Sequence, residues 1–185
     1  MTGMQWIGKA ARREEGLAYL EFALILPLLL LMVLGGTELS RYLQTGQKVD
    51  KMTHTIVDLI AQAPTISTPE LEQIMQAAQH IMSPYPFTDD GVIIVSCVGY
   101  DEYDQLRVKW QYKGGGNLLR NSAIGTTGDA PQLPTGFSIE ERDNVIIAES
   151  YYAMEPLNSN YMEPVEFYST AFYLPRLGEL DTLQP

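Results

Sequence analysis

The chain begins with a short polar stretch and then becomes apolar over the length of a membrane. Residues 17–36 contain a single charged side chain, Glu21. As an α-helix this segment is about 30 Å long, which matches the hydrocarbon core of a bilayer. Basic residues precede the segment at Lys9, Arg12 and Arg13, and none lies within it. The positive-inside rule therefore predicts a transmembrane helix whose N-terminus is cytoplasmic and whose C-terminal side lies across the membrane.

The apolar pattern continues beyond Gly36 at steps of three and four residues, which predicts that the same helix extends to about Gln62. The predicted stripe consists of Leu39, Tyr42, Leu43, Val49, Met52, Ile56 and Ile60. Pro64 ends the helix. Because a helix from Leu17 to Gln62 is long, its outer half needs a surface to pack against.

A second helix follows. Thr68 is the expected N-cap, Pro69 suits the first turn, and Pro84 lies just beyond the end. Its predicted buried stripe consists of Leu71, Ile74, Met75, Ala78, Ile81 and Met82.

The pattern then becomes extended. Residues 92–98 are continuously apolar, as in a strand covered on both faces, whereas residues 106–112 alternate, as in a half-buried strand. Residues 101–104 form the expected turn between them. A long loop at residues 113–136 precedes two further strands, Val145–Ala153 and Val165–Leu174.

These elements predict an α+β fold. A long N-terminal transmembrane helix continues into a domain with a second helix and a four-stranded antiparallel sheet, and both helices cover one face of the sheet. Residues 175–185 are predicted to be a tail.

Charge narrows the choice of function. The chain carries 12 basic and 23 acidic residues, a net charge of −11, and most of the acidity follows Gly36. Nucleic-acid binding needs a basic surface, so we expect no nucleic-acid partner. The single cysteine, Cys97, excludes an internal disulfide framework and lies in the most apolar strand, where a buried thiol is the expected role.

No motif for catalysis, metal binding or a cofactor emerges. Residues 114–116 are glycines but lack the lysine of a phosphate-binding loop. His54 and His80 have no partners at ligand spacing, and the acidic turn at residues 101–104 lacks the glycine and distal glutamate of a calcium loop. The aromatic residues of the late strands are best explained by core and cross-strand packing. We therefore expect a protein that is not an enzyme, with no cofactor and no metal.

The N-terminal motif does point to a family. Gly16, followed by "LAYLEF" and an apolar helix, resembles the prepilin peptidase signal of type IV pilin-like proteins. The longer stretch "EFALILPLLLLMVLGGTELSR", with Glu21-Phe22, resembles the TadE-like pseudopilins of the tight-adherence (Tad, or type IVc) pilus system. The late segments "VIIAESYYAMEPL" and "FYSTAFYLPRLGEL" are more loosely similar to that family.

The resemblance implies a division of the chain into a leader peptide at residues 1–16, a transmembrane helix at 17–36 and a periplasmic α+β domain at 37–185. It implies cleavage between Gly16 and Leu17 by a prepilin peptidase. It also implies that Glu21 and Phe22 act in assembly with other pseudopilins and the major pilin in the bacterial inner membrane. In such an assembly Glu21 pairs with the new amine of a neighbouring subunit, which offsets the cost of a carboxylate in lipid.

Three alternatives remain at this point. An ordinary signal peptidase would cut near Gly35-Gly36, although Val33 and Leu34 fit its site poorly. Glu21 would be a solvated residue near the headgroups if the chain were an uncleaved single-pass anchor. The domain would then be a periplasmic binding domain whose aromatic strands and long loop hold a ligand.

Two features differ from the family pattern. Glu14 and Glu15 make the leader acidic next to the cut, where basic residues are common. The domain is also much larger than that of a major Tad-type pilin, which is little more than a helix. This size favours a minor or accessory pseudopilin that supports pilus assembly and surface adherence.

Overall fold

The structure, a computed structural model, describes residues 4–140, 143–157 and 162–185, with side chains from residue 17 onward. The chain divides into two compact units, Met1–Tyr42 and Leu43–Pro185, which are described separately. Helix α1, Met4–Ala61, contributes to both. The predicted long helix is therefore confirmed, and it begins before Leu17.

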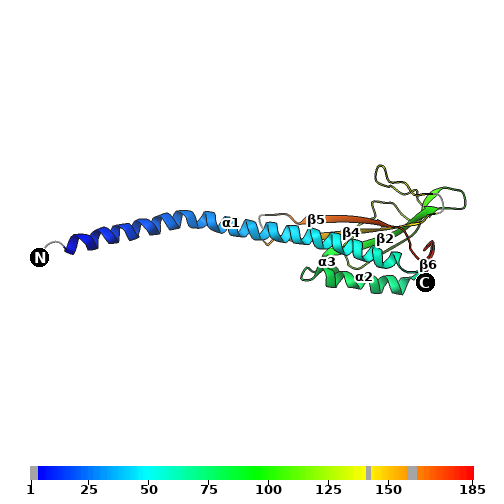
Figure 1. The fold of residues 1–185 in the computed structure, drawn as a ribbon, viewed down its shortest axis with the longest axis horizontal. Coiled ribbons are helices and arrows are strands. Elements are labelled where there is room, and N and C mark those ends of the chain that lie inside the picture. The colour runs from blue at the N-terminus through cyan, green and yellow to red at the C-terminus, as the bar shows by residue number, and fades with distance from the viewer. Residues whose placement is uncertain (1–3, 141–142, 158–161) are drawn as a thin grey trace. The chain divides into compact units, whose positions relative to one another are not determined.

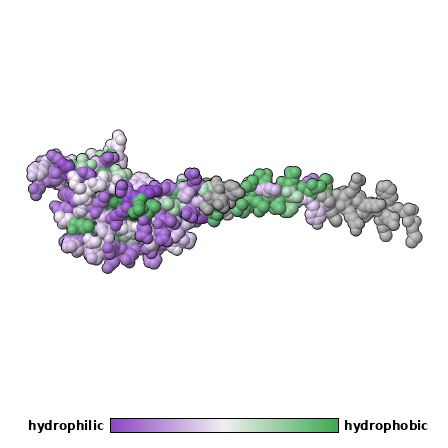
Figure 2. All heavy atoms as spheres, turned by 180° about the vertical axis from the view of Figure 1, so that it is seen from behind, coloured by the Kyte–Doolittle hydropathy of each residue, from purple (hydrophilic) through white to green (hydrophobic). Residues whose placement is uncertain are grey.

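The first unit is an exposed apolar helix. Every side chain from Leu17 to Thr37 is exposed, including the leucines of the run. The described part of α1 has the length and composition to cross a membrane, with a mean hydropathy of 2.5 in its most apolar window. Figure 2 shows hydrophobic atoms along this stretch, whereas polar residues dominate the visible surface of the second unit. A helix that is apolar on all sides and buries none of them fits a membrane anchor.

The second unit is built around an antiparallel sheet. Its strands are β2 (Gly91–Tyr100), β3 (Leu106–Gly114), β4 (Val145–Met154) and β5 (Val165–Tyr173), in the order β3-β2-β4-β5. The predicted four-stranded sheet is confirmed. The two central strands are buried along almost their whole length, which explains the apolar run of β2 and the mostly apolar sequence of β4.

Two antiparallel helices cover one face of this sheet. Figure 1 shows α2 (Thr68–Met82) alongside the C-terminal part of α1. The ammonium group of Lys48 ties the two together by donating to the carbonyls of Ile81 (3.1 Å) and Ser83. The main core lies between these helices and the sheet, as predicted. It contains Val49, Met52, Ile56 and Ile60 from α1, Leu71, Met75, Ala78 and Met82 from α2, and Ile93, Val95, Cys97, Ile146 and Ala148 from the sheet.

The predicted stripe of α1 is wrong at its N-terminal end. Leu39, Tyr42 and Leu43 have exposed fractions of 60%, 42% and 54%. The first fully buried residue of the helix is Thr45, beside Gly46, which lies against the ring of Phe167 in β5. The side chains of α1 thus become buried only where the helix reaches the sheet. The three-and-four spacing of apolar residues continues on both sides of that point, so the spacing does not show where burial begins.

The start of α2 also differs from the prediction in detail. The N-cap is Ser67 and not Thr68. Both the backbone N–H and the hydroxyl of Ser67 donate to the carboxylate of Glu70, at 2.9 and 2.7 Å, and these bonds lower the pKa of Glu70. Pro69 lies in the first turn as expected, and a short helix α3 (Phe87–Asp90) follows before β2.

The opposite face of the sheet is covered by the long connection between β3 and β4. Ile124 and Ile139 from this loop pack with Val98, Val108 and Ile147 in a second core cluster. Leu118 packs on a third cluster formed by Val92, Ile94 and Tyr151. The loop is therefore a covering layer made of irregular backbone.

The C-terminal residues are not a tail. Strand β6 (Leu183–Gln184) pairs in parallel with β1 (Ile66–Ser67), and Leu180 is buried. The indole N–H of Trp110 donates to the carbonyl of Leu180 at 2.7 Å. Gly178 passes so close to Pro64 that a Cβ there would stand 2.1 Å from its carbonyl oxygen. The segment is part of the fold, and its single glycine stands where the chain passes closest to Pro64.

Candidate functional site

The residues singled out by the sequence lie together on α1. Leu17 and Phe22 are 59% and 57% exposed, and Glu21 is exposed as well. The surroundings of Gly16 lie outside the described side chains. Leu17 and Glu21 are four residues apart, so they occupy the same side of the helix one turn from each other.

Glu21 has apolar side chains as its described neighbours on the helix. Among the described residues no hydrogen bond or ion pair joins Glu21 to another side chain, and its helical neighbours Leu17, Leu20 and Leu24 are all apolar. A carboxylate in hydrocarbon costs several kcal/mol unless it is paired or reaches water. The arrangement therefore suits a carboxylate that meets a cation from another molecule.

Neither Cys97 nor His54, which the sequence raised as a possible reactive thiol and a possible metal ligand, lies in a reactive centre among the described residues. Cys97 is fully buried, and burial raises the pKa of its thiol to about 12, so it stays protonated. His54 packs edge-on against Tyr173, with ring centroids 6.1 Å apart. No group of three metal-ligating side chains occurs among the described residues. Cys97 is thus the buried thiol that the sequence predicts, and His54 is an exposed residue of α1.

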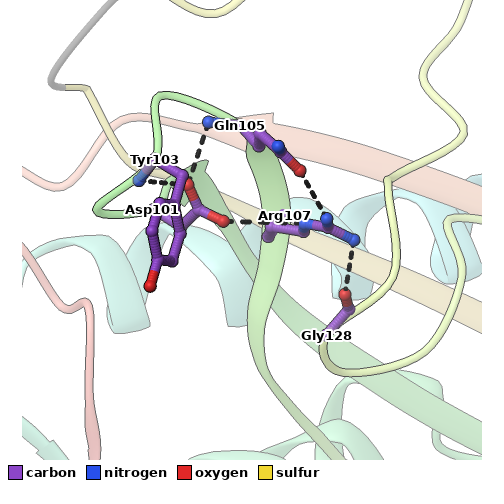
Figure 3. Close-up of polar contacts among 5 residues, drawn as sticks. All are labelled: Asp101, Tyr103, Gln105, Arg107 and Gly128. Atoms are coloured by element: carbon purple, nitrogen blue, oxygen red, sulfur yellow. Dashed lines mark hydrogen bonds and ion pairs between the residues drawn. The ribbon is translucent and has the colours of Figure 1, made fainter.

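The acidic turn between β2 and β3 is a hydrogen-bonded hairpin turn. Figure 3 shows the carboxylate of Asp101 accepting from the backbone N–H groups of Gln105 (2.9 Å) and Tyr103 (2.8 Å) and facing the guanidinium of Arg107. These contacts lower the pKa of Asp101, the bond from Gln105 most of all. The carboxylate is occupied by its own turn, which is the turn predicted at residues 101–104.

The sequence reasoning missed Glu149, the most unusual polar residue of the unit. It lies in the middle of β4 and is 0% exposed. Its carboxylate accepts four hydrogen bonds, from the hydroxyl of Ser122, the backbone N–H of Ala123 (2.8 Å), and the hydroxyls of Tyr168 (3.1 Å) and Tyr151 (3.4 Å). Four donors satisfy an ionised carboxylate, which has no proton to give.

The Glu149 cluster joins the loop to the sheet. Ser122 and Ala123 belong to the loop, whereas Tyr151 and Tyr168 come from β4 and β5. Burial, reinforced by the nearby Glu149, raises the pKa of Tyr151 to about 12 and that of Tyr168 further, so both phenols remain donors at neutral pH. The signal was present in the sequence: a lone carboxylate in the apolar strand VIIAESYYAM has to be satisfied inside the fold.

The aromatic residues of the late strands behave mostly as predicted. The rings of Tyr151 and Tyr168 contact each other with centroids 4.8 Å apart, and Tyr152 stacks on Phe87 at 6.0 Å. The loop covers Tyr151 on one face of the sheet, whereas Tyr152 lies in the main core on the helix-covered face, so both are core residues.

Comparison with known proteins gives one family match, in the N-terminal part of the chain. The family model described as TadE-like protein matches residues 16–57. The match includes the candidate residues Gly16, Leu17, Glu21 and Phe22, and it ends within the part of α1 that packs on the sheet. No curated protein and no solved structure matches the chain.

Proposed function

We propose that this chain, which is TadE-like over residues 16–57, is a minor or accessory pseudopilin of a tight-adherence type IV pilus system. The TadE-like family is a structural component of the pilus and not a family of enzymes. One observation carries the proposal: inside the matched segment, a glycine and a glutamate five residues apart open an exposed helix long enough to cross a membrane.

The proposed maturation begins with removal of the leader. A prepilin peptidase cuts between Gly16 and Leu17 at the cytoplasmic face, and residues 17–36 then hold the protein in the inner membrane. Residues 37–185 form the periplasmic domain. The cut gives Leu17 a free amine, which is largely protonated at neutral pH.

The new amine supplies the cation that Glu21 lacks. In an assembly of parallel helices, the amine of one subunit pairs with Glu21 of its neighbour, and two opposite charges come together in a medium of low dielectric constant. A buried polar pair of this kind also fixes the relative position of two helices, as buried asparagines do in coiled coils. Glu21 thereby sets how far one subunit is shifted along the next.

The size of the second unit supports a minor or accessory role for the protein in the proposed system. Residues 43–185 form a complete folded unit with its own core. Packing so large a domain around every subunit of a thin fibre is sterically demanding, whereas a few copies at its tip or base are not. The protein therefore supports assembly of the major pilin, and adherence depends on it indirectly.

Cleavage is tested by the mass of the N-terminus. We expect Gly16→Leu to leave the leader attached, because the peptidase site must accept a residue almost without a side chain. Gly35→Leu is the matched control, since Gly35 has open space around it and lies outside the proposed site. The measurement is mass spectrometry of the full chain from cells with and without the prepilin peptidase. A mature N-terminus at Thr37 in both would instead assign the cut to an ordinary signal peptidase.

The role of Glu21 is tested with a substitution that keeps its shape. We expect Glu21→Gln to insert in the membrane and to be cleaved normally, but to lose co-purification with other pseudopilins by at least tenfold, because the pairing charge is gone. Glu14→Gln, which is removed with the leader, is the control. Normal assembly of Glu21→Gln would favour the solvated single-pass anchor over the paired glutamate.

A further inference from the structure

Two tyrosines on neighbouring strands lie against each other on the loop side of the sheet. Tyr151 of β4 is directly opposite Tyr168 of β5, and their ring centroids are 4.8 Å apart with the ring planes inclined by 40°. Directly opposed residues of an antiparallel pair have their Cβ atoms about 4.5–5.5 Å apart and their side chains on the same face. The strand register therefore holds the two rings in contact.

The hydroxyl groups of both rings donate to the same oxygen atom. Oε1 of Glu149 accepts from the hydroxyl of Tyr168 at 3.1 Å and from that of Tyr151 at 3.4 Å. The two rings thus converge at their hydroxyl ends. When a phenol loses an electron and a proton, the ring carbons beside the oxygen carry much of the unpaired electron. The shared acceptor therefore brings together the ring carbons at which two tyrosyl radicals combine.

Glu149 also supplies the base that oxidation of these tyrosines requires. Both phenols are protonated at neutral pH, because burial and the nearby carboxylate raise their pKa values. A protonated phenol gives up an electron much more readily when its proton leaves at the same time. The 3.1 Å between the hydroxyl of Tyr168 and Oε1 lies within the reach of a general base, about 2.6–3.2 Å. The carboxylate is thus already in place to accept that proton.

Exposure indicates which tyrosine is oxidised first. Tyr168 is 47% exposed, whereas Tyr151 is 9% exposed. An oxidant in solution therefore reaches the ring of Tyr168. The resulting radical is in contact with Tyr151, whose burial keeps that ring away from the tyrosines of other protein molecules. The geometry favours a bond within one chain over a bond between two chains.

We propose that Tyr151 and Tyr168 form an oxidative modification site, at which a one-electron oxidant joins the two rings by a carbon–carbon bond with Glu149 as the proton acceptor. Each phenol gives one electron to the oxidant and one proton to the carboxylate, which releases it to water. The two radicals combine at the ring carbons beside the oxygens, and the hydrogen on each of these carbons then moves to the neighbouring oxygen. The product is a dityrosine with two intact phenols, and two equivalents of oxidant are reduced.

The bond would fasten β5 covalently to β4. The chain has a single cysteine, so no disulfide within the chain can provide such a link. This inference depends only on the geometry of the second unit and stands apart from the proposed role in a pilus.

The test oxidises the full chain in nonionic detergent. The probe is a ruthenium tris(bipyridine) complex, which light and persulfate convert into a one-electron oxidant. We expect dityrosine fluorescence in the monomeric band of a denaturing gel, and an intact mass that is lower by two hydrogen atoms. Proteolysis followed by mass spectrometry should give a linked pair of peptides, one containing Tyr151 and the other containing Tyr168.

Two substitutions of tyrosine locate the bond. Tyr168→Phe removes one phenol at a partly exposed position and should abolish the monomeric dityrosine product. Tyr103→Phe is the matched control, because Tyr103 lies in the turn between β2 and β3 and is 80% exposed, and it should leave the product unchanged.

Glu149→Gln separates the base from the geometry. Its carbonyl oxygen can still accept from both phenols, but the amide cannot take up their protons. We expect the initial rate of crosslinking to fall at least about tenfold, while the final yield at excess oxidant stays the same because the rings remain in contact. An unchanged rate would overturn the role of Glu149.

The position of the bond decides the rest of the proposal. The absence of dityrosine from the monomeric chain would overturn it. A crosslink between Tyr85 and Tyr152, whose ring centroids are 6.5 Å apart, in place of the predicted one would overturn it as well.

Discussion

Replacing Glu149 by alanine is expected to destabilise the second unit by about 3–5 kcal/mol, because buried donors lose their acceptor and a cavity is left. The groups that lose it are the hydroxyl of Ser122, the N–H of Ala123, and the two phenols of Tyr151 and Tyr168. Urea titration of the full chain in nonionic detergent, followed by near-UV circular dichroism, measures the loss. Amide exchange at Ala123 should accelerate as well, since its N–H is held by the carboxylate.

Glu149→Gln separates the hydrogen bonds from the charge. Its carbonyl oxygen retains the three donors that meet Oε1, and its amide group can donate to the hydroxyl of Ser122. We expect a cost of about 1 kcal/mol for this variant. Glu163→Ala, at an exposed position, should lie within about 0.5 kcal/mol of the parent chain. If Glu149→Ala were as stable as Glu149→Gln, the cluster would not be what holds the loop to the sheet.

Ending the chain after Leu174 is expected to cost about 4 kcal/mol, a large share of the stability of a typical domain. The truncation exposes the surface that Leu180 covers and leaves the indole N–H of Trp110 without its acceptor. It also removes the bond from the N–H of Arg176 to the carbonyl of Ala61. Limited proteolysis should then cut near the end of α1, where the parent chain resists.

Single substitutions measure how much individual residues contribute to this loss of stability. Leu180→Ala should reproduce about 2–3 kcal/mol of it, while Leu177→Ala should have little effect because its side chain is 71% exposed. If the truncated chain had an unchanged urea midpoint, residues 175–185 would not contribute to stability, and the tail predicted from the sequence would be the correct interpretation.

The elements that the sequence identified are those in which periodicity and burial coincide. Both central strands are buried on two faces and have β-branched residues near their starts, Val92–Val95 in β2 and Val145–Ile147 in β4, so both could be identified as strands. The burial of α1 could not be located, because the same three-and-four spacing continues through Leu39 and Leu43 into the exposed, membrane-length run. Periodicity shows which side of a helix is apolar, and the contacting surface decides where along the helix that side is covered.

The parts that could not be predicted depend on contacts between distant segments. Nothing local to residues 175–185 shows that Leu180 meets Trp110, 70 residues earlier. The covering role of the loop likewise depends on isolated residues such as Ile124, without a period that indicates a regular element. At the candidate site, the motif located Gly16 and Glu21, whereas Glu149 was passed over because a single glutamate in a strand carries no spacing to compare with a known pattern.

The parallel pairing of β1 with β6 affects when the domain can fold during synthesis of the chain. Ile66 follows closely after the end of α1, whereas its partner Leu183 is synthesised 117 residues after Ile66. Because the chain is synthesised from its N-terminus, the apolar part of α1 can enter the membrane long before β6 can pair with β1. Until residues 175–185 arrive, Trp110 and the end of α1 stay uncovered, and the long sequence separation makes this closure a late event. Synthesis of residues 175–185 is therefore the step that closes this part of the core, and a chain that lacks them remains open and accessible to proteases.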